Sequence, residues 1–333
     1  MHRRRWVAAT VAALLVGAFV AAPVAATASA PTDQGDPTTL IIGGKEARER
    51  EARAAVSIHV DGRFVCSGTA VRILDRTAVL TAAHCVTEAP AGVARTQAGG
   101  SWLVAPEVAS RGTVPEMVPM GLAVRTGRDR TTGPLIGWTR VVVMPGWSWG
   151  VEPGRVSDAA LIDPAQPLRG VVPLPLGDAR TGQVVRAVGW GLTAIDATEP
   201  PTRVQAATLR TVQAARCAGT LPAMSAGEVC VAAPHAAPYY GDSGGPIIGL
   251  HGGRLAVQGI ASRGGAASGG PAIYTAADRK LREWAEARVR GWNRDDAAME
   301  EELERDQLSG LVPVPGGVTP VPPPSVPPPG YDS

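Results

Sequence analysis

The hexapeptide Gly241–Pro246, with the sequence Gly-Asp-Ser-Gly-Gly-Pro, is the feature that most restricts what this chain can fold into. Glycines on both sides of Ser243 allow a sharp backbone turn and leave N–H groups uncovered beside the hydroxyl. Such groups can hold the negative oxygen that forms when a serine adds to an amide carbonyl. The serine also needs a base within hydrogen-bond reach. The upstream segment Thr81-Ala82-Ala83-His84-Cys85 supplies a histidine, which accepts and returns protons near neutral pH.

Further short segments accompany these two motifs in a fixed order along the chain. They are Ile41-Ile42-Gly43-Gly44, Ser157-Asp158-Ala159-Ala160-Leu161-Ile162, Gly189-Trp190-Gly191 and Gly259-Ile260-Ala261-Ser262. Together the segments resemble the chymotrypsin/trypsin family of serine proteases, from Ile41 to about Trp292. The order His, Asp, Ser differs from that of subtilisins and α/β-hydrolases. The resemblance implies an all-β fold of two six-stranded antiparallel β-barrels, with the active site between them, followed by a C-terminal α-helix.

By this resemblance, His84, Asp158 and Ser243 would form a catalytic triad. Asp158 would accept the second ring N–H of His84, fix its tautomer and stabilise the imidazolium. The backbone N–H groups of Gly241 and Ser243 would form the oxyanion hole. Three other carboxylates compete for the triad position, those of Asp75, Asp163 and Asp178. Only Asp158, however, precedes an apolar run in the family's pattern. The other histidines are interpreted as structural: His2, His59, His235 and His251.

The resemblance also implies activation by proteolysis. Cleavage of the Leu40–Ile41 bond would free an ammonium group on Ile41, which would pair with the Asp242 carboxylate and order the oxyanion loop. Because loss of one partner of a buried ion pair costs several kcal/mol, the uncut chain is expected to be inactive. Leu40 would suit the expected substrate pocket, so the enzyme could cut itself.

The substrate pocket is expected to accept small or medium apolar side chains (Ala, Val or Leu) at the residue before the cut. Its floor would be Ala237, which offers no carboxylate to a basic side chain. Ala272 would narrow the slot where the family commonly has glycine. The walls would include Ser262, Arg263 and Gly264. Arg263 stands where the family normally has tryptophan, and it is either solvated or placed to attract an acidic group of the substrate.

Composition agrees with an all-β chain that has many turns. Hydrophobic residues make up 45% and charged residues 19% of the 333, with 40 glycines and 30 prolines. Strand-like runs are expected at 56–60, 64–66, 70–74, 78–81, 139–144, near 161, and at 184–188, 207–212, 245–248 and 255–262. The Gly-, Pro- and Ala-rich residues 87–120 are expected to form a surface insertion. Apolar residues at helical spacing predict a helix over 278–292.

The N-terminus is typical of an exported protein. His2-Arg3-Arg4-Arg5 precedes an apolar run, and Ala26-Thr27-Ala28 matches a signal peptidase site. We therefore expect a signal peptide at 1–28, a propeptide at 29–40 and a secreted enzyme. The alternative is an uncleaved membrane anchor, which the small residues at the end of the run disfavour.

Four cysteines fit an oxidising compartment, and three pairings of them are possible. The family resemblance selects Cys66–Cys85 and Cys217–Cys230. No CxxC pair is present, so a metal site built from cysteines is not expected. Neither a metal nor an organic cofactor is needed for the proposed chemistry.

The last segment differs in character from the protease domain expected at 41–292. Residues 295–306 are acidic, and 311–333 hold nine prolines. A tail of this composition cannot bury much apolar surface, so residues 293–333 are expected to be disordered or extended. The tail would be a solvated spacer or, alternatively, a tether to a wall or partner.

The sequence therefore predicts a secreted serine endopeptidase that acts on protein or peptide substrates. It is expected to be a monomer without a stable membrane anchor, and a protein inhibitor is a possible partner. The formal charge of +2 implies no attraction to nucleic acid. Two alternatives stay open: a catalytically inactive homologue that acts as a binding module, and an esterase, which the order of the motifs disfavours.

Overall fold

The protein was analysed as a computed structural model that describes residues 41–87, 121–147, 157–194, 196–218, 224, 226–264 and 270–308. The expected signal peptide, propeptide and proline-rich segment lie outside these residues, as does nearly all of the expected insertion. The first elements are β1 (Lys45–Glu46), α1 (Glu49–Ala52), β2 (Ala55–Val60), β3 (Arg63–Ile73), β4 (Arg76–Thr81), the 3-10 helix η1 (Ala83–Cys85), β5 (Leu122–Thr126), β6 (Trp138–Val143) and β7 (Ala160–Pro164). They are followed by β8 (Val184–Gly189), β9 (Gln205–Val212), the 3-10 helix η2 (Ala214–Cys217), β10 (Glu228–Ala232), β11 (Pro246–His251), β12 (Arg254–Gly264), β13 (Ala272–Ala276) and α3 (Arg279–Leu308).

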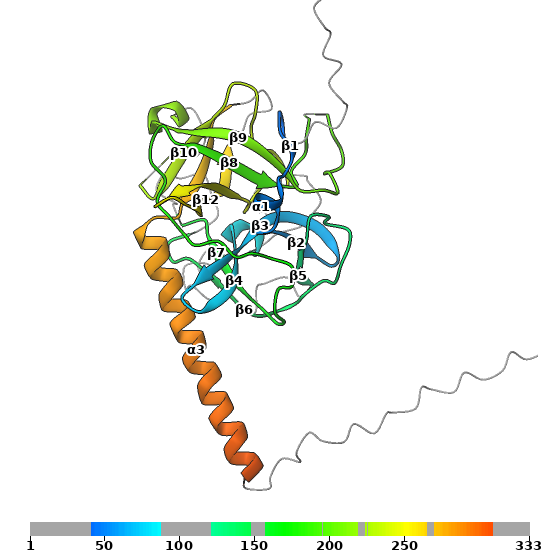
Figure 1. Cartoon of the computed structure of the whole chain (residues 1–333), viewed down its shortest axis with the longest axis vertical. Coiled ribbons are helices and arrows are strands. Elements are labelled where there is room, and N and C mark those ends of the chain that lie inside the picture. The colour runs from blue at the N-terminus through cyan, green and yellow to red at the C-terminus, as the bar shows by residue number, and fades with distance from the viewer. Residues whose placement is uncertain are drawn as a thin grey trace, which may run out of the picture. The chain divides into compact units, whose positions relative to one another are not determined.

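The first half of the chain forms a curled antiparallel sheet of six strands in the order β5-β2-β3-β4-β7-β6 (Figure 1). An isolated bridge between Val124 and Ile136 links β5 to the segment that leads into β6. The turn between β2 and β3 is Asp61-Gly62, and both residues have positive φ. An Asp-Gly pair favours this turn because its backbone twist matches that of the two flanking strands.

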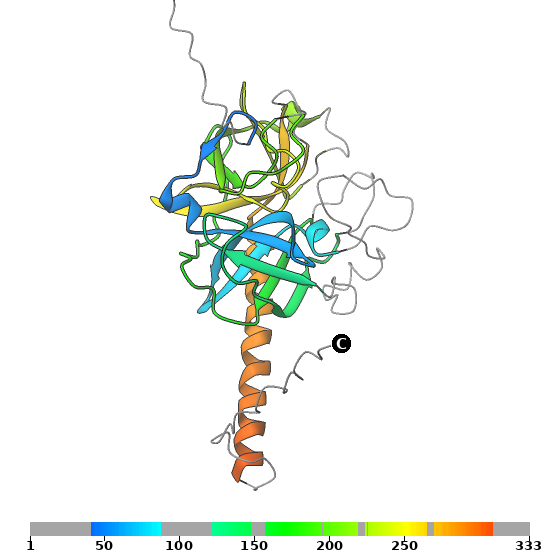
Figure 2. The same ribbon diagram turned by 90° about the vertical axis from the view of Figure 1, so that its right-hand side faces the viewer.

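The second half closes into a ring of six antiparallel strands. The order is β9-β10-β13-β12-β11-β8, and pairing of β8 with β9 completes the ring. The short strand β1 pairs with the start of β9, along the edge of β9 that does not face β8. Figure 2 shows this sheet curling round on itself. The predicted all-β, chymotrypsin-like fold with a C-terminal helix is thus confirmed: the second sheet is a closed six-stranded barrel, whereas the first is a curled six-stranded sheet. The strand runs read from the sequence match β2, β3, β4, β6, β7, β8, β9, β11 and β12, with the runs at 64–66 and 70–74 joined in the single strand β3, whereas β1, β5, β10 and β13 were missed.

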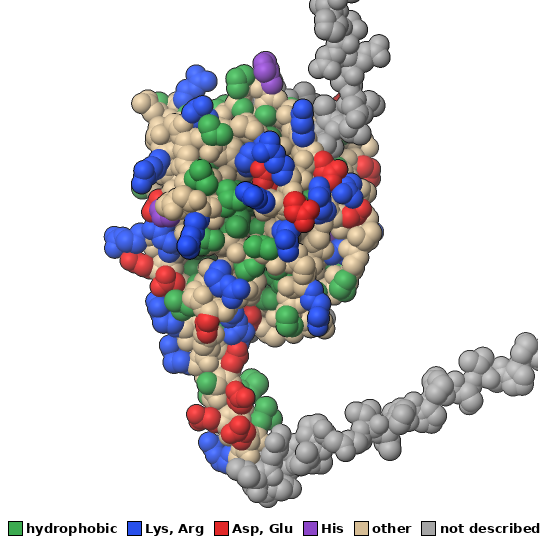
Figure 3. Space-filling model, in the orientation of Figure 1, with side chains coloured by type: hydrophobic (Ala, Val, Ile, Leu, Met, Phe, Trp, Pro, Cys, Tyr) green, Lys and Arg blue, Asp and Glu red, His purple; other side chains and the backbone are tan. Residues whose placement is uncertain are grey.

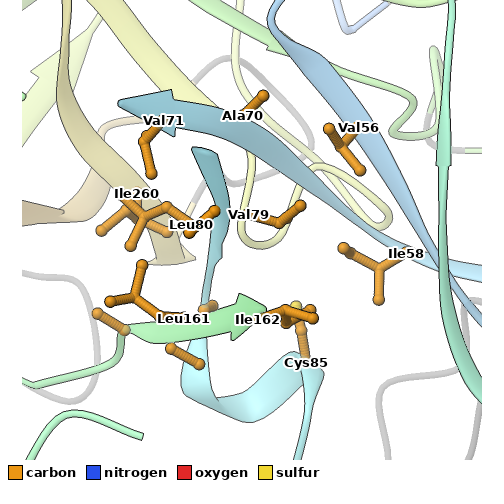
Figure 4. Packing of buried hydrophobic residues seen from close by; sticks show 14 of the residues in the cluster. Val56, Ile58, Ala70, Val71, Val79, Leu80, Cys85, Leu161, Ile162 and Ile260 are labelled. Carbon is orange, nitrogen blue, oxygen red and sulfur yellow. The ribbon is translucent and has the colours of Figure 1, made fainter. Parts of the chain in front are cut away.

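The hydrophobic core is continuous between the two sheets. Leu80, Leu161 and Ile162 are fully buried in the first sheet, and Ile260 of β12 packs beside Leu80 (Figure 4). Each fully buried aliphatic side chain contributes about 1.5–3 kcal/mol relative to an exposed one. A shared core restrains the two sheets against each other, so residues from both can be held in one site.

Both disulfides expected from the family resemblance are present. Cys66 of β3 is bonded to Cys85 of η1, and Cys217 of η2 is bonded to Cys230 of β10. The first bond fixes the residue after His84 to a central strand. The described residues contain no free cysteine.

The C-terminal helix is longer than the sequence indicated. Helix α3 begins at Arg279 and continues to Leu308, through the acidic residues that we expected to be disordered from 293 onward. Its first half packs on the protein through buried Leu281, Trp284 and Val289. Once this half is anchored, each further residue adds a helical hydrogen bond without a new nucleation cost. The acidic half is rich in Ala, Glu, Met and Leu, which are good helix formers.

Ion pairs also hold the middle of α3. Asp296 accepts a hydrogen bond from Arg76 at 2.7 Å, and a further bond comes from Arg140. Both arginines also bind Asp163, which is buried in β7. Beyond this network the helix extends away from the sheets, and acidic side chains gather along it (Figures 1 and 3). No helix among the described residues is long and apolar enough to cross a bilayer.

Candidate active site

His84 lies directly after β4, in the single turn of η1. The Thr81 hydroxyl donates a hydrogen bond of 2.9 Å to the Ser67 carbonyl, and the following Cys85 is bonded to β3. The end of β4 and the start of η1 are therefore tied to the neighbouring strand on both sides of the imidazole. This local framework depends on short-range features, which is why the motif around His84 could be recognised in the sequence.

The structure brings Asp158 to His84 across 74 residues of chain. The His84 Nδ1–H donates to Asp158 Oδ2 at 2.8 Å, and the His84 backbone N–H donates to Oδ1 at 3.1 Å. The Ser262 hydroxyl of β12 adds a bond of 2.6 Å to Oδ2, and the Thr275 hydroxyl donates to the Asp158 carbonyl at 3.0 Å. Groups from both sheets therefore orient one carboxylate that is only 5% exposed.

The electrostatics of this pair favour the charged forms. Burial alone would lower the pKa of His84, but attraction and hydrogen bonding from Asp158 raise it above its usual value. Burial would likewise raise the pKa of Asp158, but His84 and the Ser262 hydroxyl hold it below its usual value. The arrangement keeps a carboxylate beside the imidazole at neutral pH and stabilises the imidazolium when it forms.

Ser243 lies on the loop that leads into β11, and its backbone packs against the segment before His84. The Ser243 carbonyl accepts a bond of 2.9 Å from the Ser67 N–H. A Cβ at Gly244, where φ is +76°, would lie 2.1 Å from the Thr81 hydroxyl oxygen and 2.9 Å from the Ala82 nitrogen. Glycine is needed at 244 because it permits both this close approach and the left-handed backbone. Within the described part of the chain, the Ser243 hydroxyl makes no hydrogen bond, so its transfer of a proton to His84 stays a prediction.

Two backbone N–H groups on this loop are uncommitted. Among the hydrogen bonds of the described residues, none is donated by the N–H of Gly241 or of Ser243. The carbonyls of the same two peptide groups are held, since Leu192 N–H donates to Tyr240 O at 2.7 Å and Gly245 N–H donates to Asp242 O at 2.8 Å. In a trans peptide the N–H points away from the carbonyl, so these contacts also fix both donors. Two such donors can bind an oxyanion.

The Asp242 carboxylate faces away from solvent, into the second barrel, and is 3% exposed. It accepts bonds from the N–H groups of Gly191 at 2.8 Å and Tyr239 at 2.9 Å, and no cation pairs with it among the described residues. Burial raises its pKa to about 7, although both bonds act in the opposite direction. A Cβ at Gly189 or Gly191 would lie 2.3 or 2.2 Å from a carboxylate oxygen, which explains both glycines of that motif.

Ile41 is fully buried in the apolar cluster of the second barrel, which also contains Val185, Ala187 and Tyr274. Its carbonyl accepts a bond from the Gly44 N–H, and the next carbonyl, of Ile42, accepts one of 3.2 Å from Ala237. Burial and the nearby Asp242 charge raise the pKa of Tyr274 well above its usual value. Tyr274 therefore belongs to the same buried cluster as Ile41 and lies within electrostatic range of Asp242.

The residues expected to line the substrate pocket have different roles in the structure. Ala237 and Ala272 are buried, and their roles as floor and inner wall stay a prediction. The Ser262 side chain, however, is committed to Asp158, so sequence reasoning placed this residue near the site but missed its contact. Gly264 is exposed at the end of β12, and residues 265–269 lie outside the described residues.

Arg263 is neither solvated nor free to attract an acidic substrate group, contrary to both interpretations of the sequence. Its guanidinium forms two hydrogen bonds with the Glu228 carboxylate, one of them 2.8 Å long between Nη2 and Oε2. The Glu228 side chain is completely buried and that of Arg263 is 15% exposed. A neutralised pair of this kind cannot provide net charge to a substrate. The signal for it, an acidic residue in β10 and an arginine in β12 with β13 between the two strands, required the strand order to be known.

One cluster has the composition of a metal site. Atoms of Cys66, His84 and Cys85 that could bind a metal lie within 4.8 Å of one another. The two sulfur atoms are bonded to each other in the disulfide, so neither is the thiolate that a zinc ion would require. This cluster does not fit a metal.

Comparisons with known proteins agree with the fold and identify the family. A family model described as Trypsin matches residues 41–285. Among solved structures, the chain is similar to mouse neuropsin, a serine protease expressed in the limbic system of the brain. The two share 22% sequence identity with a TM-score of 0.55, and the match covers 74% of this chain and 98% of that one, which shows a common fold. A comparison with curated proteins returned no match.

Proposed function

Because this chain belongs to the trypsin family of serine endopeptidases, we propose that it hydrolyses peptide bonds through Ser243, His84 and Asp158. The Ser243 oxygen attacks the carbonyl carbon while its proton passes to His84 Nε2. The N–H groups of Gly241 and Ser243 bind the resulting oxyanion. His84 then returns the proton to the leaving amine, which leaves an acyl-enzyme. Water repeats these steps to release the acid and regenerate Ser243.

The chain of hydrogen bonds from Ser262 to Asp158 to His84 is the observation that carries this proposal. It joins both sheets at distances of 2.6 and 2.8 Å and holds the Nδ1–H tautomer, which leaves Nε2 to act as the base. The buried carboxylates of Asp163 and Glu228 pair with arginines, whereas that of Asp158 pairs with an imidazole, whose charge can form and disappear during a reaction.

Covalent labelling separates a catalyst from a binding module. The mature protein should react with a fluorophosphonate probe, and mass spectrometry should find the adduct on Ser243. Heat-denatured protein is the matched control, because an unactivated serine does not react. A folded mature protein that stays unlabelled would favour the inactive binding module.

We further propose that the protein is exported and made as an inactive precursor. The basic and apolar residues 1–28 would direct export, and removal of 29–40 would free the Ile41 ammonium. Among the described residues no cation pairs with the buried Asp242, and Ile41 belongs to the same buried cluster as Tyr274, whose pKa the Asp242 charge raises, so an ammonium at Ile41 would supply the missing positive charge. Cleavage at Leu40–Ile41 by the enzyme itself is a variant of this proposal.

The pH dependence of precursor stability follows from Asp242. The pKa of the Asp242 carboxyl is about 7 in the folded chain, whereas an unperturbed aspartate has a pKa of 3.8. The folded state therefore holds this proton more tightly than the unfolded state does. Stability from this group is therefore fully present below about pH 4 and is lost as the pH rises through 7. For a Ser243→Ala precursor, which cannot cut itself, the free energy of unfolding measured with urea should fall by several kcal/mol over this range. Adding Asp242→Asn should remove this pH dependence of the free energy of unfolding. If the free energy fell equally with pH in both proteins, the assignment of the effect to Asp242 would be wrong.

We propose that the substrate pocket accepts a small or medium apolar side chain at the residue before the cut. Buried Ala237 offers no carboxylate to a basic side chain, and the methyl group of Ala272 narrows the slot. In a peptide library, cleavage after Ala, Val or Leu should exceed cleavage after Arg or Lys by at least about 100-fold in kcat/KM, because a buried unpaired charge is costly. Ala272→Gly should raise cleavage after Phe by about 10-fold, as expected for a small change of pocket volume. A preference for Arg or Lys would overturn this part.

A further inference from the structure

Ser67 of β3 touches the oxyanion loop more closely than any motif in the sequence indicates. Its side chain is completely buried. The hydroxyl donates a hydrogen bond of 2.8 Å to the Gly241 carbonyl and accepts one of 3.0 Å from the Trp190 N–H. The Ser67 backbone N–H donates to the Ser243 carbonyl at 2.9 Å. One residue of the first sheet therefore binds both ends of the loop that carries the two uncommitted N–H groups.

The hydroxyl holds the peptide group between the two oxyanion donors. The peptides that carry the N–H groups of Gly241 and Ser243 are fixed through their carbonyls, as described above. The peptide between them joins Gly241 to Asp242, and its N–H donates to Tyr239 O at 2.9 Å. Its carbonyl, that of Gly241, accepts only the Ser67 hydroxyl among the described residues. Rotation of this central peptide would change the angle between the two donors.

Backbone surrounds the Ser67 side chain closely at this point. A Cβ at Gly189 would lie 2.9 Å from the Ser67 oxygen, and one at Gly245 would lie 3.1 Å from the Ser67 Cβ. The hydroxyl is thus enclosed by backbone that approaches closely because these residues are glycines. Within the described residues the Trp190 N–H has no acceptor other than this hydroxyl. Loss of the hydroxyl would leave a buried donor and a buried acceptor unpaired.

We propose that Ser67 is a positioning residue for the oxyanion hole, which sets the geometry of the Gly241 and Ser243 donors from the opposite sheet. The inference rests on the proposed function, because it presupposes an oxyanion at these donors. The donors act mainly in the transition state, so a misplaced donor lowers kcat and changes KM little.

The test replaces the hydroxyl and measures binding of a transition-state analogue. Ser67→Ala should lower kcat for a peptide substrate by about 10- to 100-fold while KM stays within about twofold, as for loss of one buried hydrogen bond. Affinity for a peptidyl aldehyde, whose adduct with Ser243 places an oxygen in the hole, should fall by a similar factor. Inhibition by the product peptide, which forms no adduct, should stay unchanged. Ser67→Thr, which keeps the hydroxyl, should restore most of kcat.

Thr69→Val is the matched control. Thr69 lies on the same strand, is fully buried, and its hydroxyl donates to the Ala54 carbonyl at 3.0 Å, away from the loop. This variant should lose stability to a similar extent, measured as Tm, and keep its kcat. Should Ser67→Ala not accumulate as folded protein, Ser67→Gly provides the same kinetic comparison.

The inference is overturned if Ser67→Ala keeps wild-type kcat, if kcat falls while aldehyde affinity does not, or if Thr69→Val loses kcat equally. Failure of the proposed function is a separate result. It would appear in the wild-type protein, as absence of fluorophosphonate labelling at Ser243, before any variant of Ser67 is compared.

Discussion

Replacement of Ser243 by alanine is expected to reduce kcat for peptide hydrolysis by about 10⁶-fold, because the acyl-enzyme can no longer form. His84→Ala should cost about as much, since the serine loses its base. Asp158→Asn should cost about 10⁴-fold, because an amide cannot hold the same tautomer or balance the imidazolium. The measurement is kcat/KM on one peptide substrate with each purified mature variant.

The triad acts as a unit, and this gives the prediction its sharpest test. The double variant Ser243→Ala/His84→Ala should be no slower than either single variant. Asp178→Asn is a suitable control, because Asp178 is a carboxylate that pairs with Arg282 on the surface and lies outside the proposed site. Near-UV circular dichroism should show that each variant is folded. If folded Ser243→Ala retained more than about one per cent of the activity, the proposed nucleophile would be wrong.

Release of the Ile41 ammonium is expected to raise activity by about 10²- to 10³-fold. The ammonium would ionise the Asp242 carboxyl, whose pKa is about 7 in the uncut chain, and a buried pair of this kind is worth several kcal/mol once formed. The precursor can be cut at will if residues 36–40 are replaced by an enteropeptidase site, so that cleavage occurs directly before Ile41. Activity before and after cleavage, with the new N-terminus sequenced, measures the gain.

Two variants show whether the gain depends on the ion pair. Asp242→Asn removes the charge and should abolish most of the gain, although the chain is still cut. Ile41→Gly keeps the ammonium but removes a fully buried side chain, so it should weaken the gain in part. A precursor as active as the cut enzyme, or an Asp242→Asn enzyme with the full gain, would contradict the mechanism of activation.

Residues with local requirements were recognisable from the sequence. Glycine is needed at 244 because the backbone there is left-handed and a Cβ would lie 2.1 Å from the Thr81 hydroxyl oxygen. Such local requirements produce a motif that can be recognised in the sequence. The disulfides and the pair of His84 with Asp158 followed from the order of such motifs through family resemblance. The alternation of apolar residues located most strands, because β-sheet side chains alternate between faces.

The C-terminal helix shows why composition alone was insufficient. The acidic residues after Asn293 indicated disorder because they bury little apolar surface. The structure supplies what composition omits: an anchored first half, and a contact of Asp296 with Arg76 that joins residues 220 apart. The acidic side chains would repel one another in an isolated segment, but arginines of the first sheet partly compensate their negative charge.

The pattern of residues, taken alone, determined the type of fold, the candidate nucleophile and base, and the glycines around them, because each depends on neighbours close along the chain. Only the tertiary structure decided which distant groups support them. Ser262 binds Asp158 from 104 residues away and Ser67 binds Gly241 from 174 residues away, while Arg263 is neutralised by Glu228 on a strand that was not predicted. The physical reason is that a hydrogen bond depends on positions in space, and chain spacing carries no information about those positions until the two sheets have packed.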